Sequence, residues 1–427
     1  MRKLFLTFLV AGVLPVCAGA VSLEECLSRA RENYPLIRQN ELVESLEKYS
    51  FANAAAAYLP QVQFLGQATW QTDAVEFPKE LESLSKAAGL DIKGLSRDQY
   101  KLMLQISQTV WDGGAARARK EDARAGSEVS RLSIGKELEE VESRTTEVYF
   151  GILALQENIR TLVNSLKLLE ANLSVAQAGA KNGTVMQSDI DRIRVEGLSL
   201  EQKLTETSKA LEAYRLVLSL MTGLEIGENE IFEIPTIPPV RTDVNASSAL
   251  QLFDAQAEQI RVRKAMVNSA VMPHFDLFAQ GWYGRPGLNM FNDMMYNDFS
   301  WNAMVGVRMQ WNISSFYTRR NDIRTADHQA RMLQNSKAAY QWNFSLQQTQ
   351  VEKEIEKMNE LQEKDRVIVA LRRSIRESSE SKFRNGVITA DDLLRDITEE
   401  NNAESRCNIH RLEALRNIYK LKTMLGQ

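Results

Sequence analysis

The longest regular pattern in the chain is a hydrophobic repeat in its first half. Apolar residues recur there in alternating steps of four and three over about six heptads, a spacing typical of a coiled coil. The repeat occupies Ile134, Leu138, Val141, Thr145, Val148, Ile152, Leu155, Ile159, Leu162, Leu166, Leu169, Leu173 and Ala176, and only Thr145 is polar. We therefore predict one helix over residues 115–181, about 100 Å long at 1.5 Å per residue.

Two Asn-Gly pairs interrupt the helical patterns. Asn182-Gly183 and Asn385-Gly386 each end a long pattern, and a new pattern starts a few residues later. Glycine suits the left-handed position that ends a helix, so both breaks are predicted to be turns between antiparallel helices. The candidate N-caps of the following helices and the acidic residues of their first turns are Ser188, Thr389, Asp189 and Asp392.

The two breaks belong to an internal duplication. Gly183 and Gly386 lie 203 positions apart, and the same offset relates Arg117 to Arg320 and continues to the end of the sequence. A repeat of this length indicates two structural halves rather than a short-period solenoid. We predict a first repeat at 21–222, a proline-containing linker at 223–246 and a second repeat at 247–427. Helices are expected at 22–58, 115–181 and 185–222 in the first repeat and at 247–271, 318–384 and 388–424 in the second.

Four shorter stretches alternate between polar and apolar residues and are predicted to be β-strands. They cover 61–71, 102–111, 274–283 and 300–311. Each has about 10 residues, the length of a tilted strand that crosses a membrane. A soluble antiparallel sheet with one wet face alternates in the same way, so alternation alone leaves both structures open.

Tryptophans at or near the strand ends favour the membrane structure. Aromatic side chains form girdles at the two interfaces of a membrane barrel. The candidate girdle residues are Trp70, Trp111, Trp282, Trp301 and Trp311. Four strands cannot close a barrel, and lipid does not tolerate unpaired strand edges, so several chains would have to share one barrel.

The first 20 residues have the features of a secretory signal peptide. Arg2 and Lys3 precede an apolar run that ends at Val16, and Ala18 and Ala20 form a small-residue cleavage site. A lipoprotein signal at Cys17 is the alternative, but that signal requires a small residue in place of Val16. The remaining cysteines, Cys26 and Cys407, are too few for a disulfide scaffold and are expected to be buried in helices.

Composition and motifs give no support for an enzyme. The chain has 427 residues and a net charge of −4, which provides no electrostatic argument for a nucleic-acid partner. No phosphate-binding loop or nucleophile motif occurs, and no cysteine or carboxylate lies at metal-ligand spacing from a histidine. No catalytic residue, cofactor or metal is therefore expected, and the histidines are expected to be solvated or to start a strand. They are His274, His328 and His410.

The order of these elements resembles the outer membrane efflux proteins, the TolC-like channel-tunnels. The resemblance covers essentially the whole mature chain. It rests on the helical start "SLEECLSRARENYPLIRQN" at 22–40, on Tyr58-Leu59-Pro60-Gln61 before the first strand, on "SQTVWDGG" at 107–114 after the second strand, and on both helix tips. No single motif is specific, whereas the duplicated order of helix, strand, strand, helix, helix is specific.

The resemblance implies an α+β membrane protein that forms a homotrimer. Four strands from each chain would contribute to a twelve-stranded barrel in the outer membrane. The coiled-coil helices would form a periplasmic α-barrel, which holds most of the mass. Such a channel passively conducts substrates outward in a tripartite efflux or type I secretion system. Its partners are a periplasmic adaptor and an inner-membrane pump of the RND, ABC or MFS type.

The resemblance also assigns roles to the helix tips. The adaptor would dock on Gly183, Thr184, Val185, Gly386, Val387 and Ile388. Candidate residues of the periplasmic aperture are Asp189, Asp391, Asp392 and Arg395. Some members have an acidic residue where this chain has Arg395, so a mixed ring would be less selective for cations. Polar contacts near Asp189 and Asp392 are expected to hold the closed state.

A periplasmic adaptor or coiled-coil scaffold is the alternative function. It would share the signal peptide and the helical hairpins, but an adaptor usually has one hairpin flanked by small β domains. Membrane behaviour distinguishes the two. Salt or carbonate should wash a scaffold off membranes, whereas a barrel should need detergent.

Overall fold

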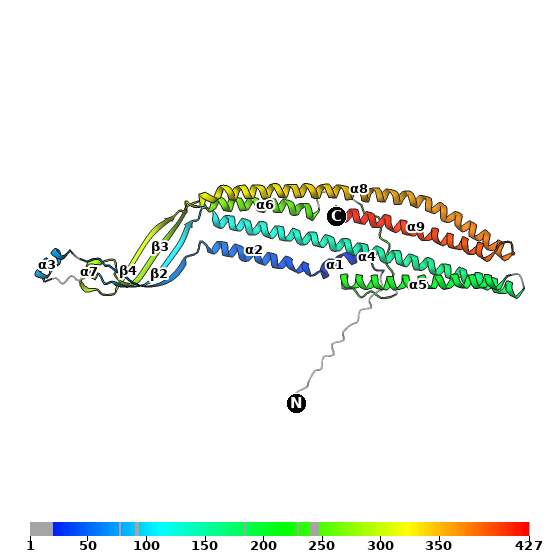
Figure 1. The fold of residues 1–427 in the computed structure, drawn as a ribbon, viewed down its shortest axis with the longest axis horizontal. Helices are drawn as coiled ribbons and strands as arrows, with labels where there is room; N and C mark the ends of the chain where they lie inside the picture. Colours follow the sequence, from blue (N-terminus) through cyan, green and yellow to red (C-terminus); the bar gives the residue numbers. More distant parts are fainter. Residues whose placement is uncertain are drawn as a thin grey trace, which may run out of the picture. The chain divides into compact units, whose positions relative to one another are not determined.

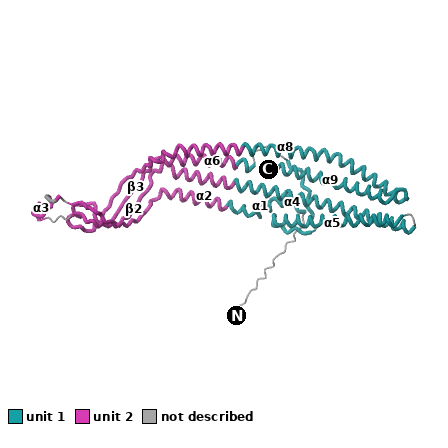
Figure 2. The backbone as a smooth tube through the Cα atoms, viewed as in Figure 1, with its two compact units in different colours: residues 1–40, 132–251, 338–427 teal, residues 41–131, 252–337 magenta. Residues whose placement is uncertain are grey.

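The computed structural model describes residues 20–76, 78–89, 94–182, 185–228, 230–239 and 247–426. The predicted signal peptide therefore lies outside the described residues, apart from Ala20. The chain divides into two compact units that cut across both sequence repeats (Figure 2). The sheet unit comprises residues 41–131 and 252–337, and the tip unit comprises 1–40, 132–251 and 338–427.

The sheet unit contains four antiparallel strands in the order β1-β2-β3-β4 (Figure 1). The strands are β1 (Gln61–Trp70), β2 (Asp98–Trp111), β3 (His274–Arg285) and β4 (Ser300–Gln310). They lie where the alternation places them, although β2 begins at Asp98 rather than at 102. Because β2 pairs with β3, the strand hairpins of the two repeats form one sheet.

The strand register gives the sheet one apolar face and one polar face. Val62, Ile106, Ala279 and Val305 lie opposite one another across the four strands, and the next row on that face is Phe64, Leu104, Gly281 and Ala303. An intervening row on the other face holds Gln63, Gln105, Gln280 and Met304. Directly opposed residues point to the same side of a sheet, so the alternation of all four strands is in phase.

Two short helices that the sequence patterns did not predict lie between the strands. They are α3 (Lys79–Ala87) and α7 (Met290–Tyr296). Asn289 caps α7, because its side chain accepts a hydrogen bond from the N–H of Asn292. Asp293 in this helix is buried and accepts a hydrogen bond from the N–H of Gly287. Such short helices carry too few turns to show a helical period in the sequence.

The helices are α1 (Leu23–Asn33), η1 (Pro35–Arg38), α2 (Gln39–Ala56), α4 (Ala115–Lys181), α5 (Gln187–Thr222), α6 (Ser248–Ser269), α8 (Ser315–Arg384) and α9 (Ala390–Met424). The prediction of one helix over 22–58 is wrong. Tyr34 is extended before Pro35, because the proline ring disfavours a helical conformation of the preceding residue. No helix in the described residues combines the length and hydropathy needed to cross a membrane.

Asp112 explains why α4 starts directly after β2. Its carboxylate accepts hydrogen bonds from the backbone N–H groups of Gly114 at 3.0 Å and Ala116 at 2.6 Å. These are first-turn donors that have no partner within the helix. The Tyr58 hydroxyl donates to the same carboxylate at 2.8 Å, so the carboxylate also joins the entry to β1 to the exit from β2.

The tip unit has two apolar cores. We call the first the linker cluster: Val21, Leu23, Cys26, Tyr149, Phe150, Ile152, Leu153, Leu211, Leu218, Phe232, Leu412, Leu415 and Tyr419. The N-terminal segment joins the linker here, because the N–H of Val21 donates to the Ile231 carbonyl and the N–H of Glu233 donates to the Val21 carbonyl. The Tyr149 hydroxyl lies 2.8 Å from the Val21 carbonyl oxygen. The predicted linker thus contributes to a core.

Candidate functional site

The second core of the tip unit holds the two helical hairpins together. We call it the tip cluster: Leu169, Ala176, Ile190, Ile193, Leu200, Phe383, Ala390, Leu393 and Ile397. These residues come from α4, α5, α8 and α9, so both hairpins contribute. Leu393 and Ile193 are each 1% exposed. Separating the hairpins at this point would expose apolar surface to water, which is unfavourable.

The turn between α8 and α9 has the predicted chemistry. Gly386 has a φ of 69°, which is the left-handed conformation expected after a helix. Thr389 is the N-cap of α9 and accepts a hydrogen bond from the N–H of Asp392. The Asp392 carboxylate accepts in return from the hydroxyl of Thr389 at 2.7 Å and from its N–H at 3.2 Å. These bonds, with a smaller contribution from Arg395, lower the pKa of Asp392.

The turn between α4 and α5 is only partly described, because Gly183 and Thr184 lie outside the described residues. The helix begins at Gln187, so Ser188 is inside it and the prediction of Ser188 as N-cap is wrong. Asp189 accepts a hydrogen bond from the N–H of Met186 at 3.3 Å. The contacts described for Asp189 and Asp392 therefore stay near the start of their own helices, and none of them joins the two hairpins.

The expected docking residues differ in exposure. Val185 and Ile388 are partly buried against the tip cluster. Val387 is 69% exposed, and Gly386 is also exposed. Among the described docking residues, Val387 is thus the apolar side chain that a partner could cover, whereas Val185 and Ile388 support the core beneath it.

A groove with a volume of ≈ 720 Å³ separates the first turns of α5 and α9. Asp391, Asp392 and Arg395 of the expected aperture set line it, together with Ser188, Asp191, Arg192, Val195, Glu196, Leu394 and Thr398. Arg192 and Asp391 form an ion pair across the groove at 3.1 Å. Arg395 is exposed and has no hydrogen-bond or ion-pair partner among the described residues. The groove therefore presents charges of both signs.

A network of charged residues that the sequence patterns did not indicate joins α8 to α9. Glu400 is 6% exposed and lies 2.6 Å from Arg376 and 3.4 Å from Arg373. Ser379 donates a hydrogen bond to Asp396 at 2.6 Å. The hydrogen bond to Glu400 raises the pKa of Arg376. Heptad spacing identifies apolar seams but gives no signal for such a pairing between helices.

The three histidines are dispersed and form no catalytic arrangement. His274 starts β3 and His328 is exposed, as the sequence suggests. His410 is only partly exposed, and its Nδ1 lies 2.6 Å from an Asp365 carboxylate oxygen between α9 and α8. Among the described residues no group of histidine, cysteine, aspartate or glutamate side chains could hold a metal ion.

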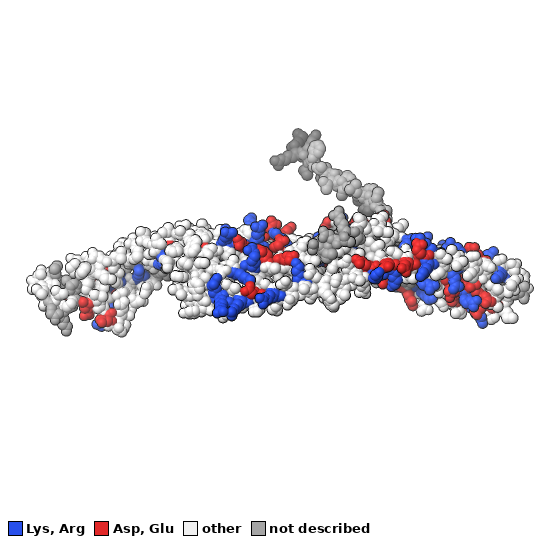
Figure 3. Space-filling view, turned by 90° about the horizontal axis from the view of Figure 1, so that it is seen from above, with Lys and Arg blue, Asp and Glu red and all other residues white. Residues whose placement is uncertain are grey.

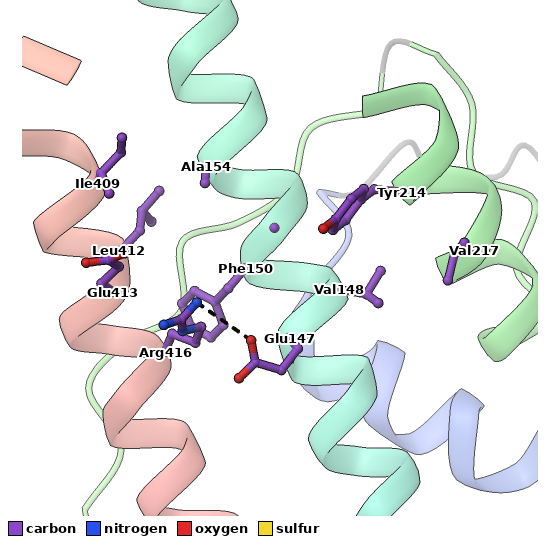
Figure 4. A pocket seen from close by; sticks show the side chains of 11 residues that line it. Glu147, Val148, Phe150, Ala154, Tyr214, Val217, Ile409, Leu412, Glu413 and Arg416 are labelled. Carbon is purple, nitrogen blue, oxygen red and sulfur yellow. Dashed lines mark ion pairs between the residues drawn. The ribbon is translucent and has the colours of Figure 1, made fainter. Parts of the chain in front are cut away.

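A cavity of ≈ 320 Å³ lies between α4, α5 and α9 in the tip unit (Figure 4). Phe150, Tyr214 and Leu412 are among its mainly apolar walls. Glu147 and Arg416 form an ion pair at 3.7 Å on its lining. The aromatic ring of Tyr214 fills the space above Gly151, where a side chain would clash at 2.4 Å. This cavity has no arrangement of groups that suggests catalysis.

Aromatic residues mark both ends of the apolar sheet face. At one end the rings of Tyr283 and Trp301 lie 5.1 Å apart and those of Tyr283 and Phe299 lie 5.6 Å apart. We call this group, with Trp70 and Tyr100, the first rim. At the other end Trp111 packs on Phe275 at 5.8 Å and Trp311 packs on Phe316 at 6.4 Å. These four residues form the second rim.

An irregularity in β2 places Trp111 in the second rim. The register shifts between Thr109 and Trp111, so that Trp111 lies opposite Phe275. A bulge of this kind changes the direction of a side chain relative to the alternation of its strand. Directly after β4, the indole N–H of Trp311 donates to the Val271 carbonyl at 3.0 Å, which fixes the ring at the end of that strand.

Trp282 lies on the polar face, contrary to the prediction that it belongs to an aromatic girdle. It is opposite Met103 and Asn302, and it is 5% exposed. The Lys101 ammonium lies 4.3 Å from the centroid of its ring. Strand-end position suggested the girdle, but the phase of the alternation decides which face a residue occupies.

The separation of the two rims matches a lipid layer. Trp301 and Trp311 are ten residues apart along β4 and its exit, which corresponds to about 33 Å of extended chain. At a strand tilt of about 40° this length spans about 25 Å, the height of the outward apolar band of membrane barrels. The apolar side chains between the rims are exposed, including Phe64 at 71% and Val305 at 81%.

Residues 26–224 match the family model of the outer membrane efflux proteins. No curated protein sequence matches the chain. The matched range runs from α1 to the end of α5 and thus covers most of the first sequence repeat.

Three solved structures show the same fold over nearly the whole chain. The outer membrane protein VceC from Vibrio cholerae has a TM-score of 0.71 and 13% identity, with 95% of this chain and 96% of that chain covered. The Campylobacter jejuni CmeC outer membrane channel has a TM-score of 0.68 and 13% identity, with 95% and 85% covered. The open state of the Neisseria gonorrhoeae MtrE outer membrane channel has a TM-score of 0.69 and 13% identity, with 95% and 88% covered.

Proposed function

We propose that the chain is an outer membrane efflux protein and that copies of it form a passive conduit across the outer membrane. The family match supports an efflux channel and not the adaptor or scaffold alternative. The observation that carries the proposal is the apolar sheet face between two aromatic rims. Water would be an unfavourable neighbour for this face, whereas lipid tails would cover it without cost.

The edges of the sheet indicate that more than one chain forms the barrel. β1 and β4 each have one neighbour in the described sheet, so each leaves a row of backbone groups unpaired. In lipid those groups must pair, and β1 of one copy can pair with β4 of the next. Three copies would give a twelve-stranded barrel, which is the assembly that the family resemblance implies. The glutamine row of Gln63, Gln105 and Gln280 would then face the aqueous lumen.

The pairing of Val21 with the linker is compatible with the proposed cleavage after Ala20. Val21 follows the proposed cleavage site and pairs with the linker on both sides of Phe232. Removal of residues 1–20 would leave this pairing intact. We propose that the mature protein resides in the outer membrane, with the helical hairpins in the periplasm.

The tips are the proposed contact for a periplasmic adaptor, through Gly183, Thr184, Val185, Gly386, Val387 and Ile388. The adaptor would connect the channel to an inner-membrane pump of the RND, ABC or MFS type. Asp391, Asp392 and Arg395, with Asp189, are the proposed lining of the aperture. A passive conduit needs no chemical step, cofactor or metal.

The decisive experiment measures the protein mass of the detergent-extracted, membrane-derived particle by light scattering, after a carbonate wash of the membranes. A mass near three mature chains is the expected result. A monomer in the soluble periplasmic fraction would show that the sheet never meets lipid and would overturn the proposal. Conductance in a planar bilayer then tests whether the particle is open to ions.

A further inference from the structure

The first turns of α4 and α8 carry an excess of positive charge, and only some of these cations have a partner within the described fold. Residues 115–124 contain four cations and two acidic residues, and residues 315–324 contain three cations and one acidic residue. The whole chain, in contrast, has a net charge of −4. Both stretches follow strands that run toward the same end of the sheet, because β2 and β4 are each antiparallel to β3.

Some cations on the first turns of α8 have a hydrogen-bond partner among the described residues, and others have none. The Arg319 guanidinium donates to the Asn268 side chain at 2.9 Å and so connects α8 to α6. Arg320 and Arg324 are exposed and have no hydrogen-bond or ion-pair partner within the described ranges. Their spacing of four residues places them on one face of the helix. Tyr317, one turn before Arg320, is 80% exposed.

On α4, too, some cations are paired within the described residues and others are not. Arg117 forms an ion pair with Glu121 at 3.0 Å. Arg119, Lys120 and Arg124 have no ion-pair partner in the described part of the chain. Figure 3 shows lysine and arginine side chains gathered on the helices of the sheet unit. Both sequence repeats therefore place unpaired cations one to three helical turns beyond the second rim.

We infer that these cations bind the phosphate groups of anionic phospholipids at the membrane surface next to the second rim. We call Arg119, Lys120, Arg124, Arg320 and Arg324 the basic belt. The inference rests on the proposed function, because it requires the apolar sheet face to lie in lipid.

The chemistry of the belt fits that ligand. An aromatic rim lies at the level of the lipid headgroups, and long cationic side chains beyond it reach phosphate oxygens while their stems cover apolar surface. The guanidinium group binds phosphate through two parallel hydrogen bonds, and a pair of arginines four residues apart can hold one headgroup from two sides. Headgroups with a net negative charge should bind this surface more tightly than zwitterionic headgroups, because the cations of the basic belt have no acidic partners of their own among the residues that the structure describes.

The test compares lipid binding by the detergent-extracted full-length protein and by the double variant Arg320→Gln, Arg324→Gln. Binding of phosphatidylglycerol, phosphatidylcholine and inorganic phosphate is measured by native mass spectrometry. Wild-type protein should prefer phosphatidylglycerol over phosphatidylcholine, and the double variant should bind phosphatidylglycerol about tenfold more weakly. The preference should also weaken as salt is raised.

The matched control is Arg366→Gln, which removes an exposed arginine far along α8 that pairs with Glu363 at 3.1 Å. This variant should keep the preference of the wild type. Equal binding of both phospholipids by the wild type, or an unchanged preference in the double variant, would overturn the inference. Binding of inorganic phosphate alone would also overturn it, because a site for a free anion needs no membrane. If one of these contrary results is obtained with a particle that has the mass of three chains, only the inference about lipid binding fails. A monomeric soluble protein would instead overturn the proposed function.

Discussion

Arg192 on α5 pairs with Asp391 on α9 at 3.1 Å, and this contact bridges the two hairpins at the rim of the tip groove. The two side chains are 56% and 70% exposed, so water screens their attraction. Beneath them the tip cluster joins the same two hairpins through buried apolar contacts. The two kinds of contact make different predictions about what holds the two hairpins together.

We expect Asp391→Asn to have a small effect on opening. An exposed ion pair contributes about 0.5 kcal/mol, which corresponds to roughly a twofold shift in the closed-to-open ratio for each chain. Single-channel conductance or open probability in a planar bilayer measures the shift. Glu363→Gln is the control, because its partner Arg366 lies on the same helix. An effect as large as that of a substitution in the tip cluster would contradict the expectation that the exposed ion pair contributes little.

Leu393→Ala should weaken the closed tips much more. Leu393 is 1% exposed, and truncation of a buried leucine costs about 2–5 kcal/mol. Faster hydrogen exchange at the starts of α5 and α9, together with a higher open probability, is the expected result. Val387→Ala serves as the control, because Val387 is 69% exposed and its truncation should change stability by less than about 0.5 kcal/mol. Equal effects of the two variants would show that the tip cluster does not close the tips.

The cap of α9 should depend on pH. Hydrogen bonds from Thr389 to the ionised Asp392 carboxylate lower the pKa of this group below its ordinary value of 3.8. The cap is therefore fully formed above the pKa of the unfolded state and is lost as the pH falls through the lower pKa of the folded state. Amide protection factors at the start of α9, corrected for intrinsic exchange, should fall in that acidic range.

Asp392→Asn removes the charge and should abolish this pH dependence. Thr389→Ala should lower protection at every pH, because loss of an N-cap costs about 1 kcal/mol. A wild-type cap that is insensitive to acid would show that the carboxylate contributes nothing to it.

The sequence predicted features that depend on local spacing. Heptad spacing and the Asn-Gly pairs located α4 and the turn at Gly386, and alternation located the strands. The break of the first helix at Pro35 is also a local feature, and the proline itself was the signal that the prediction of 22–58 overlooked. The short helix α7 depends on a single cap at Asn289, which is too weak a pattern to stand out.

Other features of the site are not local and could not be predicted in this way. The contact of Glu400 with Arg376 joins two helices whose relative rotation the heptads leave open. The pairing of Arg192 with Asp391 joins residues 199 positions apart in the sequence. The tryptophans show a third limit, since strand-end position suggested a girdle, whereas the face of each ring depends on its phase within the sheet.

The phase of the tryptophans leads to a direct test of which sheet face meets lipid. Trp301 is 81% exposed on the apolar face, whereas Trp282 is 5% exposed on the polar face beside Lys101. Variants that retain one tryptophan, with the others replaced by phenylalanine, can be reconstituted in vesicles with brominated acyl chains. We expect strong quenching of Trp301 fluorescence by the bromines and little quenching of Trp282. A water-soluble quencher admitted to the lumen should have little effect on Trp301 fluorescence, because lipid tails and headgroups shield this side chain. Strong bromine quenching of Trp282 with none of Trp301 would assign the polar face to lipid and contradict the proposed barrel.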